Sequence, residues 1–545
     1  MATLGLTDII GPVMVGPSSS HTAGALRIAS MARRLCPTPP VRVEFQLLGS
    51  FAHTLTGHGT DKALVAGMLG FAPDDLRIRN SFAHAREAGL SFSFTPLPDA
   101  EYDHPNTIDI LMWGDAGDAM RVRGESIGGG AAVIRRIDDV EVHITGENTS
   151  VVVRQTDTPG VLAHIAQCLN EQHVNIATAR MYREGRGDVA WTVLETDQVV
   201  SEGARQAILA SPSIADVRVI PAEAPASTLV PLPATPCAVL SADEQAAGLE
   251  RFGALDFASG AALLELCATR GWRISEAFLA REAALGASNG HPDTSARYLQ
   301  RVLKVMKDAA FKPIGEAQPS IGGLLGGEAA KMAALRGTAT GLIGEPGSSA
   351  AAYAMAVLET NASMGRIVAA PTAGSAGVIP GVLLALQQTR GYSDDEVARG
   401  IACAAAVGYL ITRNATVAGA EGGCQAEIGS AAAMAAAAAV ELAGGAPAQC
   451  LDAAGNALTN MMGLVCDPVA GLVEVPCQKR NAAGAATALV SAQIALAGIG
   501  NLVDFDQTVE AMYKVGRSLP FELRESALGG LAATPAACEW CAAHR

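Results

Sequence analysis

Three cysteines in the second half of the chain lie in polar, glycine-flanked surroundings. Cys424 lies in AGAEGGCQAEIG, Cys466 in MGLVCDPVAG and Cys477 in VEVPCQKRNAA. An iron–sulfur or other soft-metal site needs thiolates that converge from loops with small neighbours, because a cluster is bulky and its sulfides need backbone donors. The spacing of 41 and then 10 residues fits neither a zinc ribbon nor a ferredoxin. On these residues alone, buried structural thiols remain an alternative.

Two histidines in the first sixty residues are candidates for a general base. His21 lies in SSSHT and His58 in GHGTDK, and an imidazole pKa near neutrality suits proton transfer. A structural role is the alternative for each ring. The hydroxyls around His21 could bind a substrate carboxylate or simply cap the helix that follows. They belong to Ser18, Ser19, Ser20 and Thr22.

Two further motifs could bind an anion through backbone N–H groups. In PTAGSAG, Thr372, Gly374 and Ser375 could present such groups to a carboxylate, or the segment could be a tight turn that opens a helix at 378–386. Lys331 follows GGLLGGEAA and is the only one of seven lysines beside a glycine-rich run that could cradle a phosphate. A salt-bridged helix lysine is the alternative, and we predict no pyridoxal phosphate.

Composition limits the class of protein. The chain has 545 residues, of which 49% are hydrophobic and 17% charged, so it is neither disordered nor a coiled coil. Its net charge of −15 argues against nucleic-acid binding. Eleven cysteines are too dilute for a disulfide scaffold, and the paucity of aromatic residues predicts a core of closely packed Ala and Gly.

No signal peptide is predicted, and we expect a cytoplasmic protein without a membrane partner. The segment 481–503 has no charged residue and is long enough to span a bilayer, and 428–440 is a shorter Ala-rich run. Both contain mostly small residues, so we interpret them as buried helices of a soluble protein.

Periodicity and turn residues divide the chain into three domains and a linker. Residues 1–148 predict a mixed α/β domain with strands at 41–48, 91–95, 107–113 and 140–144 and a helix at 61–69. Residues 149–221 predict a ferredoxin-like βαββαβ order, with strands at 150–155, 174–181, 188–195 and 214–220 and helices at 159–172 and 201–209. A proline-rich linker at 222–237 leads to an all-α domain at 238–545. The predicted fold class is therefore multidomain α+β.

Six motifs, in order, resemble the bacterial iron–sulfur L-serine dehydratases (L-serine ammonia-lyases) over nearly the whole chain. They are GPSSSHTAGALRIA, GHGTDKALVAGMLG, GGLLGGEAAKM, MGRIVAAPTAGSAGVIPG, AGAEGGCQAEIG and GLVCDPVAGLVEVPCQKRNA. The first domain resembles the family's β domain and the helical domain its α domain. Between them, DTPGVLAHIAQCLNEQHVNIATARMYR resembles the ACT domain, a small amino-acid-binding module, as in one fused form of the family.

The resemblance implies a 4Fe–4S cluster held by Cys424, Cys466 and Cys477, with one iron open to act as a Lewis acid. It implies conversion of L-serine to pyruvate and ammonia in serine catabolism that feeds gluconeogenesis. His58 or His21 would reach the cluster across the domain interface, and we favour His58 as the base. We also expect a homo-oligomer.

Two finer expectations follow from the same resemblance. Gly160 and Asn175 would flank an effector amino acid, although the module could have lost its ligand. A cysteine near the C-terminus would occupy the fourth iron until substrate displaces it, and Cys538 is our choice. The residues EWCAAHR depart from a terminal cysteine, so Cys541, or a simple surface C-x2-C pair, is the alternative.

Two other functions remain open at this stage. One is an L-cysteine desulfidase-type lyase, and the other is a non-catalytic sensor of amino acids and oxygen. The cysteines not yet mentioned are interpreted as structural thiols: Cys36, Cys168, Cys237, Cys267, Cys403 and Cys450.

Overall fold

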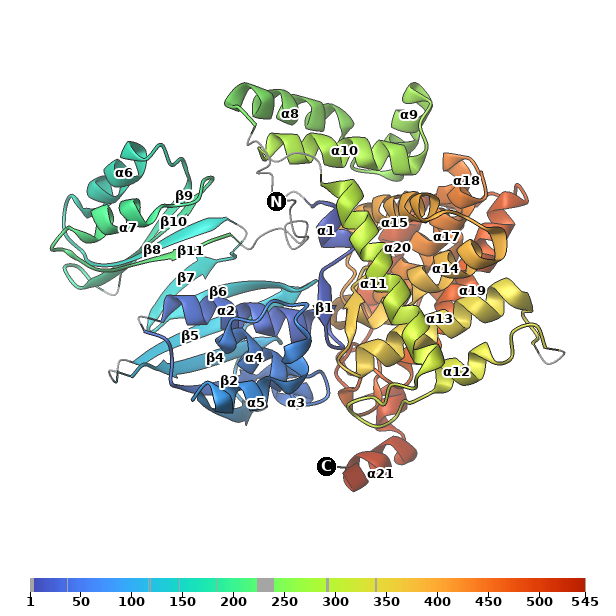
Figure 1. The fold of residues 1–545 in the computed structure, drawn as a ribbon, viewed down its shortest axis with the longest axis horizontal. Coiled ribbons are helices and arrows are strands. Elements are labelled where there is room, and N and C mark those ends of the chain that lie inside the picture. The colour runs from blue at the N-terminus through green and yellow to red at the C-terminus, as the bar shows by residue number, and fades with distance from the viewer. Residues whose placement is uncertain are drawn as a thin grey trace. The chain divides into compact units, whose positions relative to one another are not determined.

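The computed structural model describes residues 4–544 except 37, 116, 118, 147, 184, 223–239, 291–293 and 339–340. These residues form two compact units (Figure 1). The sheet unit is Ser20–Pro225, and the helical unit combines Met1–Ser19 with Ala226–Arg545. The predicted multidomain α+β class with a helical C-terminal region is confirmed. From residue 223 onward, the predicted linker at 222–237 lies outside the described residues.

The larger sheet of the sheet unit has six strands in the order β3-β2-β4-β5-β6-β7. β2 and β3 are parallel, and the other pairs are antiparallel. Val43, Phe45 and Leu47 alternate along β2 and are buried, which is the pattern of a strand with one covered face. Helices α2 and α4 lie on one face of this sheet (Figure 1). Gly124 of β5 lets α2 approach closely, because a Cβ there would lie 2.3 Å from Ile28 Cγ2.

The bounds of these elements match most of the predicted ones. Strands β5 and β6 are additional to the prediction, since Gly124 and Gly128 interrupt the pattern of β5 and the apolar residues of β6 do not alternate. The elements are α2 (Ala25–Leu35), β2 (Arg42–Leu48), α3 (Gly49–Thr54), α4 (Thr60–Leu69), α5 (Ser81–Glu87), β3 (Ser91–Leu97), β4 (Thr107–Trp113), β5 (Ala119–Gly128), β6 (Ala131–Ile137) and β7 (Val140–Ile144).

The smaller sheet has the order β11-β8-β10-β9 and is antiparallel throughout. Its core includes Val151, Ile165 and Leu194, contributed by both strands and helix. The predicted βαββαβ order is confirmed, whereas the likeness to an ACT domain stays a prediction. The elements are β8 (Thr149–Thr156), α6 (Val161–Glu171), β9 (Ile176–Arg183), β10 (Val189–Thr196), α7 (Glu202–Leu209) and β11 (Ile214–Ile220).

The helical unit includes the first residues of the chain, which differs from the predicted boundary of the first domain. Leu6 N donates to Glu282 Oε2 at 2.7 Å, and the Tyr298 hydroxyl donates to Ile10 O at 2.5 Å. Strand β1 (Val13–Val15) pairs antiparallel with β12 (Arg366–Val368), so the unit is not purely helical.

Its helices are joined by connections that range from short turns, as between α14 and α15, to longer loops, as between α18 and α19. They are α1 (Leu6–Ile9), α8 (Ala242–Leu255), α9 (Gly260–Arg270), α10 (Ile274–Ser288), α11 (Ser295–Gly315), α12 (Glu328–Ala333), α13 (Gly344–Ala362), α14 (Val378–Arg390), α15 (Asp394–Asn414), α16 (Gly419–Gly422), α17 (Ser430–Leu442), α18 (Pro447–Met461), α19 (Cys477–Leu496), α20 (Phe505–Ser518) and α21 (Pro535–His544).

Small residues let these helices pack with close backbones, as the composition predicts. Every residue of α17 from Ser430 to Glu441 is buried. At Gly381 in α14, a Cβ would lie 2.7 Å from Ala350 O of α13. The α13–α14 contact therefore excludes even a methyl group.

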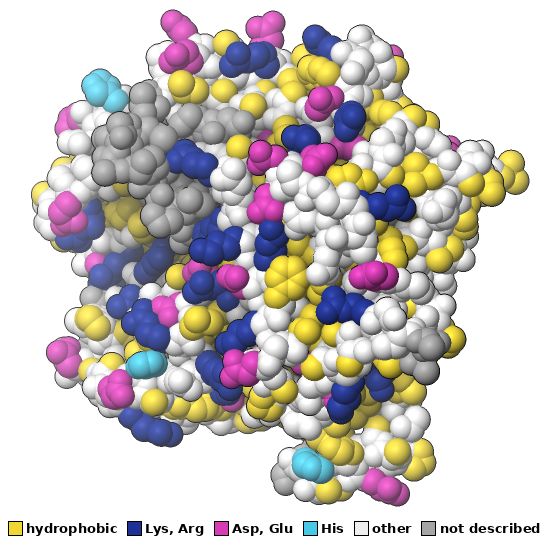
Figure 2. Space-filling view, turned by 45° about the vertical axis from the view of Figure 1, so that its right-hand side comes forward, with side chains coloured by type: hydrophobic (Ala, Val, Ile, Leu, Met, Phe, Trp, Pro, Cys, Tyr) yellow, Lys and Arg dark blue, Asp and Glu magenta, His cyan; other side chains and the backbone are white. Residues whose placement is uncertain are grey.

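In the described part of the chain, no single helix combines the length and hydropathy of a membrane span, and α8 with α9 would do so only as a pair bent by 108°. On the face drawn in Figure 2, Lys and Arg side chains lie among Asp and Glu side chains. The net negative charge is therefore not gathered into one acidic area on that face.

The space around two helical glycines predicts different effects of Gly→Ala substitution on stability. Gly381→Ala should destabilise the helical unit by about 1–3 kcal/mol, because the new methyl group meets backbone. Gly253→Ala in α8, where no atom lies within 4 Å of the new Cβ, should be neutral or stabilise by up to about 1 kcal/mol. Thermal unfolding followed by circular dichroism measures both, and equal shifts would contradict the close packing.

Candidate metal centre

The three cysteines of the predicted metal site come from three different segments of the helical unit. Cys424 directly precedes the π-helical turn Gln425–Gly429 that leads into α17, and Cys477 is the first residue of α19. Cys466 lies in the loop after α18 and pairs through its backbone with a later segment. Its N–H donates to Leu523 O at 2.9 Å, and Glu525 N donates to Cys466 O at 2.8 Å. The side chains of the three cysteines are 3%, 4% and 7% exposed in chain order.

The structure brings Cys424 and Cys466 together with a carboxylate. One oxygen of Glu427 and the two Sγ atoms lie within 4.8 Å of one another. Cys466 Sγ lies 3.9 Å from Glu427 Oε2. Cys477 is outside this tightest group, but its thiol interacts electrostatically with Cys424. All three predicted cysteines therefore belong to one buried neighbourhood.

The surroundings keep the thiols of Cys466 and Cys477 protonated when no metal is bound. The hydrogen bond with Cys424, followed by burial, raises the pKa of the Cys466 thiol well above its usual range. Burial does the same to the pKa of Cys477. Arg480 supplies positive charge, because its Nη1 lies 3.7 Å from Cys424 Sγ and 2.8 Å from Asp467 Oδ1. Converging thiols beside a guanidinium fit a metal group that displaces thiol protons and carries net negative charge.

Glu427 is a functional candidate that sequence reasoning missed. Thr372 Oγ1 donates to Glu427 Oε1 at 2.7 Å, and burial raises the pKa of the carboxyl group. Gly374 and Gly419 leave space for it, since a Cβ at these positions would lie 3.1 Å and 2.6 Å from its oxygens. The signal was its position three residues after Cys424, which places both side chains on one side of a helical turn.

A second, partly buried acid, Glu525, lies near this group. Burial, together with the charge of Glu427, raises the pKa of Glu525 to about 8. Glu525 therefore holds a proton at neutral pH, which limits the negative charge buried beside the thiols.

The PTAGSAG segment contacts Glu427 and leads into a helix, whereas binding of a carboxylate by its backbone N–H groups stays a prediction. Thr372 contacts Glu427, and Ser375 Oγ is buried against the segment's own backbone. Asn481 of α19 holds the loop on both sides: Gly377 N donates to its Oδ1 at 3.0 Å, and its Nδ2 donates to Gly374 O at 2.8 Å. Helix α14 begins directly afterwards, at Val378.

The glycine-rich run before Lys331 binds an internal carboxylate. Gly322 N and Leu324 N donate to Glu474 at 2.8 Å and 2.9 Å, and Ser320 Oγ donates to it at 2.6 Å. Lys331 lies in α12 and is exposed. These amide groups therefore have an anionic partner within the protein itself.

The two candidate histidines contact each other within the sheet unit. The ring centroids of His21 and His58 are 4.5 Å apart. His21 hydrogen-bonds through Nδ1 to Ser20 Oγ at 2.9 Å and through Nε2 to Ser50 Oγ at 2.8 Å. Neither ring nitrogen of the buried His58 has a hydrogen-bond partner among the described residues.

Both rings are neutral at physiological pH. Burial lowers the pKa of His58 to about 4. Burial, followed by the charges of His58 and His104, lowers the pKa of His21. A neutral imidazole with an unengaged nitrogen is the form that can accept a proton.

The hydroxyls of SSSHT are held by the local fold. A π-helical turn at Ser19–Gly24 runs directly into α2, so the helical segment begins at Ser19 and the capping alternative stays a prediction. Ser126 Oγ donates to Ser20 O at 2.8 Å, and Thr22 Oγ1 donates to His58 O at 2.7 Å. Ser18 and Ser19 are buried.

The predicted tail and effector residues lie outside this cysteine group. Cys538 is exposed on α21, and Cys541 is partly exposed on the same helix. Gly160 begins α6, whereas Asn175 follows the end of that helix, about 16 Å away along 11 residues. The structure therefore does not bring Gly160 and Asn175 together within one chain.

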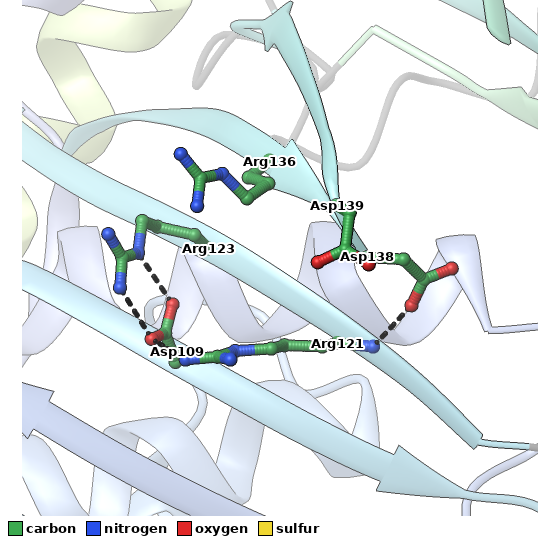
Figure 3. Close-up of a pocket in the computed structure, with 6 residues that line it drawn as sticks. All are labelled: Asp109, Arg121, Arg123, Arg136, Asp138 and Asp139. Carbon is green, nitrogen blue, oxygen red and sulfur yellow. Dashed lines mark hydrogen bonds and ion pairs between the residues drawn. The ribbon is translucent and has the colours of Figure 1, made fainter. Parts of the chain in front are cut away.

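A charged pocket on the larger sheet is a poor alternative site. Figure 3 shows that Arg121, Arg123, Arg136, Asp109, Asp138 and Asp139 line it. Asp109 is ion-paired with Arg121 and Arg123 at 2.6 Å and 2.7 Å. These pairs hold the pKa of Asp109 below its usual range despite partial burial. The charges of the pocket's arginines and aspartates neutralise one another, and no Cys, Ser, Thr or His is among the residues that line it.

Two protein-family models match this chain, each over a different segment. The serine dehydratase beta chain family matches residues 7–136, and the serine dehydratase alpha chain family matches residues 269–532. The L-serine dehydratase of Streptomyces coelicolor is 30% identical over 543 residues, 96% of this chain and 97% of the relative.

Relatives made of separate chains match its two parts. The probable L-serine dehydratase alpha chain of Bacillus subtilis is 45% identical over 273 residues, 50% of this chain and 90% of the relative. The L-serine dehydratase beta chain of Peptoniphilus asaccharolyticus is 40% identical over 202 residues, 37% of this chain and 91% of the relative. The chain therefore belongs to the serine dehydratase family, with beta-chain and alpha-chain segments fused in one polypeptide.

Proposed function

We propose that this protein is an L-serine dehydratase that converts L-serine to pyruvate and ammonia. The observation that carries the proposal is the buried group of Cys424, Cys466 and Glu427, in a chain matched along its length by a relative of that name. The elimination removes the Cα proton and expels hydroxide, a poor leaving group. It needs a base for the proton and an electrophile for the hydroxyl.

We infer that Cys424, Cys466 and Cys477 hold a 4Fe–4S cluster as thiolates. The donor set fits, because all three thiols are buried in one neighbourhood and Arg480 offsets negative charge there. Bound there, the cluster supplies a Lewis acid for the substrate hydroxyl. Cys538 is proposed to occupy the fourth iron only until substrate displaces it.

The chain's own polar groups around the cysteines have separable tasks. Thr372 fixes one oxygen of Glu427 and leaves the other facing Cys466. Arg480, held by Asp467 and Val465 O, keeps its charge at Cys424. Glu427 is placed to exchange a proton with a group bound beside the thiols.

His58 is the proposed base for the Cα proton. Its ring is neutral, and both nitrogens lack a partner among the described residues. His21 is held by two serines and packs edge-on against His58, so its proposed task is to orient that ring.

The proposed regulatory module is the βαββαβ segment, with Gly160 and Asn175 as effector contacts. Since these residues lie at opposite ends of α6, one effector molecule could touch both only between two copies of the module. This requirement is consistent with the proposed homo-oligomer.

Substrate turnover tests the proposed reaction directly. Anaerobically reconstituted protein should form pyruvate from L-serine faster than from L-cysteine, measured with lactate dehydrogenase coupling on one preparation. Faster sulfide release from L-cysteine would favour the desulfidase alternative. Absence of pyruvate from either amino acid would favour the sensor.

Replacement of a cluster cysteine should remove both cofactor and activity. Cys424→Ser, Cys466→Ser and Cys477→Ser should each lose iron and acid-labile sulfide and reduce pyruvate formation below detection, because a cluster held by two thiolates is not retained. Cys168→Ser, a buried thiol in the sheet unit, is the matched control and should keep both. Wild-type iron content and turnover in any of the three variants would contradict that residue's role.

Replacement of His58 should separate catalysis from cluster binding. His58→Ala should keep iron and sulfide but reduce kcat by roughly 10²–10⁴, the usual contribution of a general base. The exposed His53→Ala is the control and should leave kcat unchanged. Because the pKa of His58 is about 4, its ring is neutral above that value. The acidic limb of kcat/KM that it causes should lie near pH 4, and a limb near 6.5 would argue against this base.

A further inference from the structure

A second buried group of thiols and a carboxylate lies in the helical unit and shares no residue with the first. Cys403 of α15, Glu441 of α17 and Cys450 of α18 place their ligand atoms within 4.8 Å of one another. Cys403 is 0%, Cys450 1% and Glu441 4% exposed. Both cysteines were interpreted from the sequence as structural thiols, and the proposed reaction uses neither of them.

The carboxylate of this group lacks a cationic partner. Among the described residues no Lys or Arg forms an ion pair with Glu441, and its Oε2 accepts a hydrogen bond from Ser275 N at 3.1 Å. The Ser275 hydroxyl is completely buried and has no hydrogen-bond partner within the described part of the chain. A buried carboxylate beside an unsatisfied hydroxyl is unfavourable unless a cation or proton compensates.

The spacing of the three ligand atoms is close to that around a bound ion. A tetrahedral ion with metal–sulfur bonds of about 2.3 Å holds its ligand atoms roughly 3.8 Å apart. The ligand atoms of Cys403, Glu441 and Cys450 lie within 4.8 Å of one another, so movements of about 1 Å would bring them to that spacing.

We propose that Cys403, Glu441 and Cys450 form a site for a divalent, thiolate-preferring metal ion such as Zn²⁺. The mixed sulfur and oxygen donors suit zinc. An ion that displaces the protons of the two thiols leaves the net charge of the buried group unchanged. The ion would join α15, α17 and α18, and it must enter during folding because every ligand is buried.

Cobalt substitution tests the site without interference from the iron site. The full chain carrying Cys424→Ser, Cys466→Ser and Cys477→Ser, refolded anaerobically with Co²⁺, should bind one Co²⁺ per chain. It should show thiolate-to-cobalt charge transfer and the visible bands of a tetrahedral ion. Adding Cys403→Ala and Cys450→Ala should abolish these bands, whereas Cys36→Ala and Cys168→Ala, which also remove two buried thiols, should leave them unchanged.

Two further measurements keep the test decisive if the multiple variants fold poorly. In the otherwise unchanged chain, Cys403→Ala with Cys450→Ala should remove one Zn²⁺ per chain and leave iron and sulfide unchanged. Glu441→Gln, which preserves the side-chain volume, should weaken Co²⁺ binding at least about tenfold. Zinc retained without both thiols, no zinc in the unchanged protein, or a Cys403–Cys450 disulfide in an anaerobic digest would each overturn the proposal.

Discussion

The cysteine site depends on the burial of one carboxylate, that of Glu427, among thiols. A charge in this position is tolerated only where hydrogen bonds and space are supplied together. Thr372 donates to it, and glycines at 374 and 419 replace side chains that would collide with it. Asn481 then fixes the loop that carries Thr372 and Gly374. The same glycines that make the sequence motif recognisable are therefore the ones that accommodate the acid.

Residues with an unusual local sequence could be predicted as functional. Residues whose role depends on distant contacts in the fold could not. Cys424, Cys466 and Cys477 stood out because glycine-flanked polar cysteines are uncommon. Glu427 did not, because a single acid before an alanine-rich helix has the pattern of a helix N-terminus. Its role depends on Thr372, 55 residues earlier, and no local pattern encodes that contact.

The same limit separates the predicted from the unpredicted parts of the fold. Alternation and turn residues were enough for the βαββαβ order, because each of its strands carries its own local pattern of apolar residues. Strands β5 and β6 were missed because Gly124 and Gly128 interrupt the pattern of β5, and the apolar residues of β6 do not alternate. The boundary of the first domain was displaced because α1 and β1 find their partners in the helical unit, through contacts such as Leu6 with Glu282.

The β1–β12 pairing has a consequence for biosynthesis. Val13 pairs with Val368, so the first strand leaves the ribosome about 355 residues before its partner. At roughly 5–20 residues per second, that interval is about 20–70 seconds. During this time the apolar segment Val13–Val15 is without its native neighbour, while the sheet unit, which lies wholly between the two strands, is already complete. The pairing of β1 with β12 can therefore form only late in synthesis of the chain.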